Sequence, residues 1–241
     1  MHNIPRLTKD QVNSVTRLEF RGQNLYIDMH VHSKRSDDAG GTAEGYLKWI
    51  NVLRKKGHQV DGIVLTEHRT FDIEADYTDL ANQYGVVVLK GSEIETDLGH
   101  VLVYGVTPWL MAQFDFTDIT LPAVDVFQAV KDSGGYAVAA HPGRTRIGLW
   151  QHVQNGVTLP DVRTIERLNG GSNNDENALA GQLAESYGFS CVGGSDSHYV
   201  STIGKCITKY EGSITCLEDL VEELSGGKFE AVTLGDTKVT E

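Results

Sequence analysis

Short apolar runs that favour an extended chain alternate with amphipathic stretches along most of this sequence. "GIVLTEH" at residues 62–68 and "VVVLKGSEIE" at 86–95 have the composition of buried strands. Between residues 42 and 57, large apolar side chains recur at helical spacing before a glycine ends the run. Repeated strand–helix units predict a largely parallel sheet or barrel, and 241 residues are enough for one α/β barrel domain.

The other expected elements continue this alternation. We expect helices over residues 73–84, 122–131, 177–188 and 216–227, the last of which would close the chain, and strands over 136–142, 164–170 and 190–198. "HVLVYGV" at 100–106 follows the strand 86–95 too soon for a helical crossover, so this pair is predicted to be antiparallel or a local hairpin. No linker divides the sequence, so we expect an N-terminal lead segment, residues 1–24, and one domain, residues 25–241.

The stretch "YIDMHVHS" at residues 26–33 places two histidines in a predicted strand. Side chains alternate along a strand, so Asp28, His30 and His32 should share one face. Two neighbouring imidazoles can bind one metal ion, with a carboxylate nearby to orient them. Taken alone, the pair could equally be two exposed or hydrogen-bonded histidines on an edge strand.

Other metal-binding residue types lie at the ends of the later predicted strands. They are His68, Glu93, His100, His141, Asp196 and His198. Parallel barrels build their sites at the carboxyl ends of their strands, so we expect these side chains to converge at the barrel mouth. Only three of the nine histidines lie elsewhere, and we expect those three at the surface.

A cluster of six imidazoles and several carboxylates would be destabilised by repulsion and desolvation unless cations neutralised it. We therefore expect two or three divalent metal ions. The net charge of −12 argues against a nucleic-acid-binding surface, which needs clustered Lys and Arg. Bound cations would nevertheless allow an acidic protein to bind a phosphate group.

The sequence also bears on location and redox chemistry. No window approaches the roughly 18 apolar residues that span a bilayer, and the first residues lack an apolar signal core. We expect a cytoplasmic protein with no membrane partner. The three cysteines, Cys191, Cys206 and Cys216, are odd in number and should be buried apolar side chains.

The ordered motifs of the sequence resemble those of the PHP (polymerase and histidinol phosphatase) superfamily of metal-dependent phosphoesterases. The motifs are "DMHVHSKRSD", "LTEH", "GSEIE", "GHVLVYG", "AHPGR" and "GGSDSH", spread from residue 26 to residue 199. The resemblance implies a single-domain, distorted (β/α)7 TIM-like barrel. "LTEH" departs from the commonest pattern because Glu67 stands where aspartate is more usual. Glu67 should point away from His68, so we expect it either to support the metal ligands from behind or to have a structural role.

The resemblance also implies how the metals are shared. One metal would be held by His30, His32, Glu93 and Asp196, a second by Glu93, His100 and His141, and a third by Asp38, His68 and His198. Such mixed nitrogen and oxygen sets suit Mn, Fe or Zn better than Mg or Ca. His100 could instead face the core, given its short connection to Glu93.

The expected activity is metal-dependent hydrolysis of a phosphate ester of a small metabolite or nucleotide. A hydroxide bridging two metals would attack phosphorus, with His30, His32, Glu93, Asp196 and His198 forming the catalytic centre. Arginine can bind a phosphate through two parallel hydrogen bonds. Arg69, Arg144, Arg146 and Asn169 are therefore the candidate substrate-binding residues; Glu166 ends the same predicted strand as Asn169.

Two alternatives remain open at this point. An amidohydrolase-type barrel also begins with His-x-His on a strand, but it would ordinarily use a bridging lysine where this chain has Glu93. A metal-stabilised regulatory module without catalysis could afford to lose ligands, whereas every motif here retains its metal-binding side chain.

Overall fold

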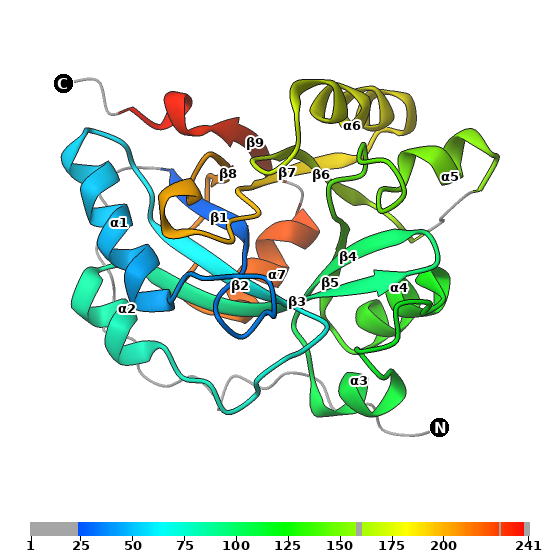
Figure 1. Ribbon diagram of the computed structural model, residues 1–241, viewed down its shortest axis with the longest axis horizontal. Helices are drawn as coiled ribbons and strands as arrows, with labels where there is room; N and C mark the ends of the chain where they lie inside the picture. Colours follow the sequence, from blue (N-terminus) through cyan, green and yellow to red (C-terminus); the bar gives the residue numbers. More distant parts are fainter. Residues whose placement is uncertain (1–23, 158–160, 227, 239–241) are drawn as a thin grey trace.

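The computed structural model describes residues 24–157, 161–226 and 228–238 (Figure 1). The predicted lead segment, residues 1–24, lies outside the described residues except for its last residue. Within these described residues, nine strands form a single sheet in the order β7-β6-β5-β4-β3-β2-β1-β8-β9. The strands are β1 (Leu25–Val31), β2 (Gly62–His68), β3 (Val87–Thr96), β4 (Gly99–Tyr104), β5 (Tyr136–Ala139), β6 (Thr164–Asn169), β7 (Ser190–Gly194), β8 (Cys206–Tyr210) and β9 (Phe229–Thr233).

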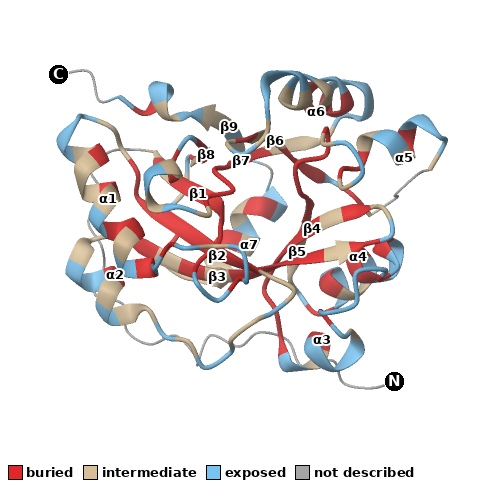
Figure 2. Ribbon diagram, in the orientation of Figure 1, coloured by how far each residue is buried: buried red, intermediate tan, exposed pale blue. Residues whose placement is uncertain are grey.

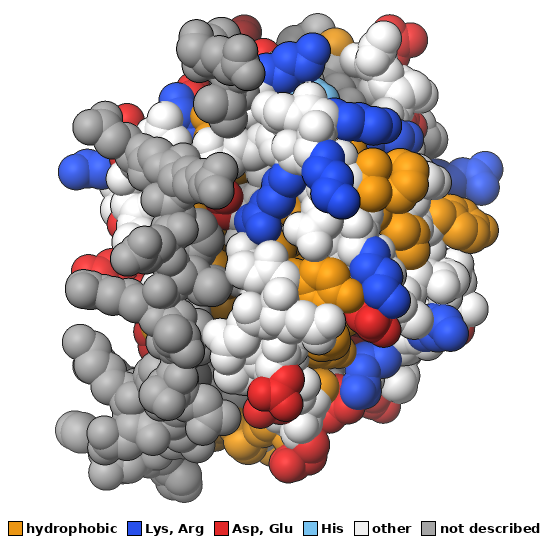
Figure 3. All heavy atoms as spheres, turned by 90° about the vertical axis from the view of Figure 1, so that its left-hand side faces the viewer, with side chains coloured by type: hydrophobic (Ala, Val, Ile, Leu, Met, Phe, Trp, Pro, Cys, Tyr) orange, Lys and Arg blue, Asp and Glu red, His pale blue; other side chains and the backbone are white. Residues whose placement is uncertain are grey.

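Helices lie outside the curved sheet, and buried residues concentrate on the strands (Figure 2). The α-helices are α1 (Ala43–Lys55), α2 (Thr78–Tyr84), α3 (Pro108–Gln113), α4 (Ala123–Asp132), α5 (Trp150–Gln154), α6 (Asn174–Tyr187) and α7 (Leu217–Gly226). Figure 3 shows several Lys and Arg side chains on the side of the molecule that lies at the left of Figure 1, where α1 and α2 are. Acidic side chains also lie on this face, so it carries both signs of charge.

The first seven strands curl into a nearly closed barrel. Neighbours β1, β2 and β3 are parallel, as are β5, β6 and β7, whereas β4 is antiparallel to both β3 and β5. The segment after β7 returns to β1, where the Asp196 amide donates to the His30 carbonyl at 2.7 Å and Val31 pairs with Ser197. This arrangement confirms the predicted TIM-like barrel and the antiparallel β3–β4 pair.

Local interactions explain where the helices begin and end. Helix α1 starts after Thr42, whose side chain accepts the amide of Gly45, and the chain leaves it through Gly57 at φ 84°. Helix α2 starts at residue 78, five residues later than predicted. The Asp72 and Asp76 carboxylates accept amides two or three residues further on, and such turns compete with a helix.

The end of the chain differs from the prediction. Helix α7 is not the closing element, because β9 follows it and pairs with β8. Figure 1 shows α7 behind the ring of strands, near its centre. Its Leu220 and Leu224 pack in one cluster with Met29 and Tyr104, so α7 supports the barrel from behind while the strand ends remain available for a site.

Candidate metal centre

The two histidines of β1 meet two carboxylates inside the barrel. His30 Nε2 and His32 Nε2 lie 2.9 Å apart. Glu93 Oε2 is 3.1 Å from the first nitrogen and 3.2 Å from the second, and Asp196 Oδ1 is 3.5 Å and 3.2 Å from the same atoms. All four residues are buried, so the ligand set predicted for the first metal converges on one point.

The other oxygen of Glu93 faces a second pair of histidines. Glu93 Oε1 lies 2.8 Å from His100 Nδ1 and 2.9 Å from His141 Nε2. Because β4 runs antiparallel, its first residues, which include His100, reach the same rim as the carboxyl ends of the parallel strands. His100 therefore faces the site rather than the core, and Glu93 lies between the two groups as predicted.

A third group lies nearer the surface. Asp38 Oδ2 is 3.4 Å from His68 Nε2 and 3.3 Å from His198 Nε2, and these two nitrogens are 3.4 Å apart. His68 also places Nδ1 3.0 Å from Glu93 Oε2. His32 joins His68 and His198 in a set whose candidate ligand atoms all lie within 4.8 Å of one another. The third group is thus continuous with the first.

The prediction that Asp28, His30 and His32 share one face of a regular strand is wrong. The pairing of β1 with β2 shifts register between Asp28 and Val31, so one extra residue is accommodated there. Met29 packs in the cluster that contains α7, whereas Val31 packs in a different cluster with Tyr46 and Leu47 of α1. The Asp28 carboxylate accepts the amide of Ser195 at 2.7 Å, so it fixes the loop after β7 and does not orient an imidazole ring. Burial raises the pKa of Asp28 to about 6.

A buried carboxylate that sequence reasoning left without a role supports the metal site. Glu166 accepts His30 Nδ1 at 3.0 Å, the His141 amide at 2.8 Å and Asn169 Nδ2 at 2.9 Å. A register shift between Glu166 and Leu168 lets residues 166 and 169 both reach the interior. A regular strand would place residues 166 and 169 on opposite faces, so the sequence "TIERLN" could not have revealed that both reach the site.

Arg144 belongs to the same network. Its Nη2 donates to Asp196 Oδ2 at 2.7 Å and to Asn169 Oδ1 at 2.8 Å, and its Nε donates to Ser172 Oγ at 2.9 Å. It lines a hollow of about 240 Å³ together with four of the site histidines. The predicted substrate-binding pair Arg144 and Asn169 therefore lies beside the first metal group.

The remaining arginines and Glu67 are placed differently. Arg69 lines the hollow, but its guanidinium already donates to Glu95 at 2.9 Å and to Asp37 at 3.0 Å. Arg146 is exposed and does not line the hollow. Glu67 accepts the amide and hydroxyl of Ser33, which matches its predicted structural role.

The electrostatics of the cluster favour ionised carboxylates. Burial opposes protonation of His30, but Glu166, Asp196 and Glu93 raise its pKa well above the ordinary value. Burial also opposes ionisation of Glu93, but His30 and the hydrogen bonds of His100 and His141 hold its pKa well below the usual range. Burial lowers the pKa of His141, which leaves that imidazole neutral. Metals bind ionised carboxylates and neutral imidazoles. Glu93 and His141 are already in those forms, whereas a cation must displace a proton from His30.

The donor atoms fit divalent cations. Two imidazole nitrogens 2.9 Å apart, with carboxylate oxygens on the same side, cannot all be satisfied by hydrogen bonds among themselves, whereas a cation accepts every lone pair. His141 Nδ1 is the only buried side-chain nitrogen or oxygen without a hydrogen-bond partner among the described residues. The histidine and glutamate groups are therefore compatible with divalent metals.

The backbone at the rim is held in a sparsely populated conformation. Among the described residues, the non-glycine residues with positive φ are Arg69, His141, Arg146 and Asp196, at 53°, 27°, 73° and 51°. Arg69, His141 and Asp196 lie within two residues of the ends of β2, β5 and β7 and line the hollow, whereas Arg146 lies further along the loop after β5. Such strain costs about 1–3 kcal/mol per residue and clusters at functional sites.

Fold and site together define an α/β barrel with a histidine-rich, carboxylate-bridged centre at its rim. Residues 174–229 match a family model described as PHP-associated. An uncharacterized protein of Methanocaldococcus jannaschii is 28% identical over 125 residues, which make up 49% of this chain and 68% of that protein.

Solved structures share the fold. A candidate metal-dependent phosphoesterase from Bifidobacterium adolescentis superposes with a TM-score of 0.54 at 18% identity, covering 83% of this chain and 95% of that one. The lesion-specific endonuclease PfuEndoQ from Pyrococcus furiosus gives a TM-score of 0.60 at 14% identity, covering 86% of this chain and 57% of that one. The family-model match confirms the predicted resemblance to the PHP superfamily, and the solved structures confirm the barrel fold. Within the described residues, no helix has both the length and the apolar character needed to cross a membrane.

Proposed function

We propose that this protein hydrolyses a phosphate ester with two or three divalent cations, such as Mn, Fe or Zn, as cofactors. The observation that supports this most strongly is the position of Glu93. One of its oxygens faces His30 and His32, and the other faces His100 and His141. A carboxylate so placed can bridge two cations. When bound, the cations would lower the pKa of a coordinated water and neutralise charge on the phosphoryl oxygens.

The chain's own residues position these components. One cation would be held by Glu93 together with His30, His32 and Asp196, and a second by Glu93 together with His100 and His141. A third, nearer the surface, would be held by Asp38, His68 and His198. Because Asp38 is more than half exposed, the third site would be the most easily vacated.

Arg144 orients the substrate in this proposal. The guanidinium is fixed by Asp196 and Asn169 at one edge of the hollow, so it can bind a phosphate oxygen without a large rearrangement. The hollow of about 240 Å³ favours a small phosphorylated substrate. Arg69 would act mainly on the shape of the mouth, because two carboxylates already bind it.

The set of metal ligands favours phosphate ester hydrolysis over the amidohydrolase alternative. Glu93 occupies the place of a bridging lysine, and His198 adds a third group of ligands that a single-metal or two-metal amidohydrolase does not require. Convergence of all the predicted ligands also argues against a module that has lost catalysis.

The test is a substrate panel. Purified protein supplied with Mn should hydrolyse phosphomonoesters or phosphodiesters but not amides or lactones. Asp196→Asn should abolish hydrolysis while leaving the fold intact, because asparagine tolerates the φ of 51° at this position. Hydrolysis of amides alone, or full activity of Asp196→Asn, would overturn the proposal.

A further inference from the structure

A second hollow opens beside the metal site. It has a volume of about 470 Å³ and shares Arg69 with the first hollow. Its lining combines polar side chains, such as Gln113 and Thr117, with apolar ones. The three large apolar side chains that are at least partly exposed, Phe71, Met111 and Phe114, form what we call the aromatic shelf. Met111 is 39% exposed, and the two rings are half-buried. An apolar surface of this kind next to a polar site is typical of substrate pockets.

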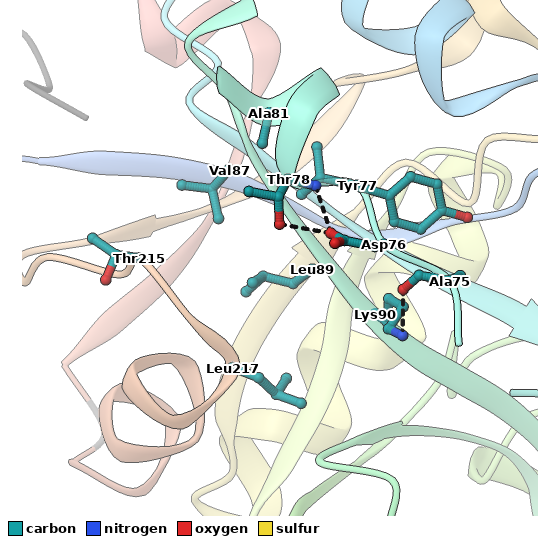
Figure 4. A pocket seen from close by; sticks show the side chains of 11 residues that line it. Ala75, Asp76, Tyr77, Thr78, Ala81, Val87, Leu89, Lys90, Thr215 and Leu217 are labelled. Carbon is teal, nitrogen blue, oxygen red and sulfur yellow. Dashed lines mark hydrogen bonds between the residues drawn. The ribbon is translucent and has the colours of Figure 1, made fainter. Parts of the chain in front are cut away.

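The loop on one side of the shelf is fixed to β3. The Arg69 amide donates to the Glu93 carbonyl at 2.8 Å, and Ser92 Oγ donates to the Thr70 carbonyl at 2.9 Å. Lys90 Nζ lies 5.3 Å from the centre of the Phe71 ring. Lys90 also donates to the Ala75 carbonyl at 2.6 Å, a hydrogen bond that Figure 4 shows in a separate pocket between α2 and α7. Phe71 is therefore held in position before any ligand arrives.

The other side of the shelf comes from α3 and the turn that follows. Thr107 caps α3 by accepting the Leu110 amide at 3.2 Å, and Phe114 leaves the helix in an extended conformation. Asp115 Oδ1 then accepts the amide and hydroxyl of Thr117, which closes a tight turn. These contacts fix the direction in which the chain presents Phe114.

The two hollows differ in charge, so they suit different parts of a substrate. On the shelf side, the Arg69 guanidinium is bound by Glu95 and Asp37, and Asp115 adds a negative charge. The shelf is thus unsuited to an anion and suited to an uncharged, flat apolar group. The metal hollow is suited to the phosphate. At about 240 Å³ it is smaller than the roughly 300–1,000 Å³ of typical ligand sites, so a substrate larger than a simple phosphate needs adjoining space.

We propose that the aromatic shelf binds a ring on the alcohol side of the phosphate ester, so that the protein prefers substrates whose alcohol carries an aromatic group. This inference rests on the proposed phosphate hydrolysis at the neighbouring site. Phe71 and Phe114 would contact the ring through their apolar faces, while Met111 would adapt to its outline. The shelf would affect substrate binding only, because the phosphate that reacts lies at the metal centre.

The test compares two esters of similar alcohols, benzyl phosphate and ethyl phosphate, with added Mn. The wild-type protein should show a kcat/KM at least about tenfold higher for the benzyl ester, the order of effect expected for one well-filled apolar contact. Met111→Ser and Phe114→Ala should each remove most of this preference through KM while leaving ethyl phosphate unaffected. The matched control is Ile119→Ser, because Ile119 is 55% exposed and lies outside the hollow.

Binding of non-hydrolysable benzylphosphonate and ethylphosphonate, measured by calorimetry on Mn-loaded protein, separates the two proposals. Tighter binding of the benzyl compound that is lost in Phe114→Ala supports the shelf even if no ester is turned over. Hydrolysis without any preference for the ring, or equal binding of both phosphonates, would overturn the shelf alone. Absence of all phosphate ester hydrolysis would overturn the proposed function.

Discussion

Replacing Glu166 by glutamine should weaken metal binding without unfolding the protein. The glutamate oxygens accept three N–H groups, from His30 Nδ1, the His141 backbone and Asn169 Nδ2. Glutamine has one acceptor oxygen and one NH₂ group, so one of these donors must face another donor. The substitution changes one atom and little volume, which confines its effect to hydrogen bonding.

Of the three donors, His30 can accommodate the new amide most easily, because its ring can carry its proton on either nitrogen. This change would weaken metal binding. The glutamine oxygen can keep the His141 amide and Asn169, while its NH₂ group donates to His30 Nδ1. In the neutral ring that binds a metal, the proton of His30 would then lie on Nε2, the nitrogen that faces His32 and Glu93. A protonated Nε2 cannot bind a cation. Loss of such a supporting carboxylate typically weakens metal binding by about 10- to 100-fold, or about 1.4–2.7 kcal/mol.

Calorimetric titration of metal-free protein with Mn²⁺ or Zn²⁺ measures this loss. The matched control is Asp61→Asn, which also converts a buried carboxylate to an amide but contacts Tyr26 and Gln59 instead of a site residue. Asp61→Asn should retain wild-type metal affinity. Wild-type affinity in Glu166→Gln, or an equal loss in Asp61→Asn, would refute the proposed role of Glu166.

Three further predictions concern substrate binding, packing and thiol chemistry. Arg144→Ala should raise KM for phosphate esters by about 10- to 100-fold, since a hydrogen bond to a charged group contributes about 1.5–3 kcal/mol; an unchanged KM in steady-state assays would mean that Arg144 serves only Asp196. Gly194→Ala should lower the free energy of unfolding by about 1–3 kcal/mol in denaturant titrations, because the added Cβ would lie 2.4 Å from His30 Cβ; wild-type stability would contradict this packing. Burial raises the thiol pKa of Cys206 to about 12 and that of Cys216 to about 11, so both are protonated at pH 8. Their reaction with a disulfide reagent should be slow in the native protein and accelerate as pH rises, and rapid reaction of all thiols at pH 8 would show that they are exposed.

The residues at the site could be predicted from sequence because they occur in short motifs at strand ends. A parallel barrel brings strand ends together whatever the distance between them in the chain, so His30, Glu93 and Asp196 converge although each is at least 60 residues from the next. The antiparallel strand carrying His100 was also predictable, because its connection to β3 is too short for a helix.

Other features depend on interactions that local patterns do not contain. The register shifts in β1 and β6 redirect Asp28 and bring Glu166 beside Asn169, and no periodicity in the sequence reveals an extra residue. Among the described strands, β9 pairs with β8 alone, so its existence depends on a tertiary neighbour that its own sequence does not reveal. Helix α2 starts late because Asp72 and Asp76 form turns that compete with it.

X-ray diffraction from crystals grown with Mn, with anomalous differences measured at the metal edge, tests the central claim most directly. We predict two or three anomalous peaks among the histidines and carboxylates at the barrel rim. One peak should lie among His30, His32 and Asp196, one beside His100 and His141 with Glu93 between the two, and the third beside His68 and His198. A crystal soaked in Mn that shows no peak among these side chains would contradict the proposed metal centre.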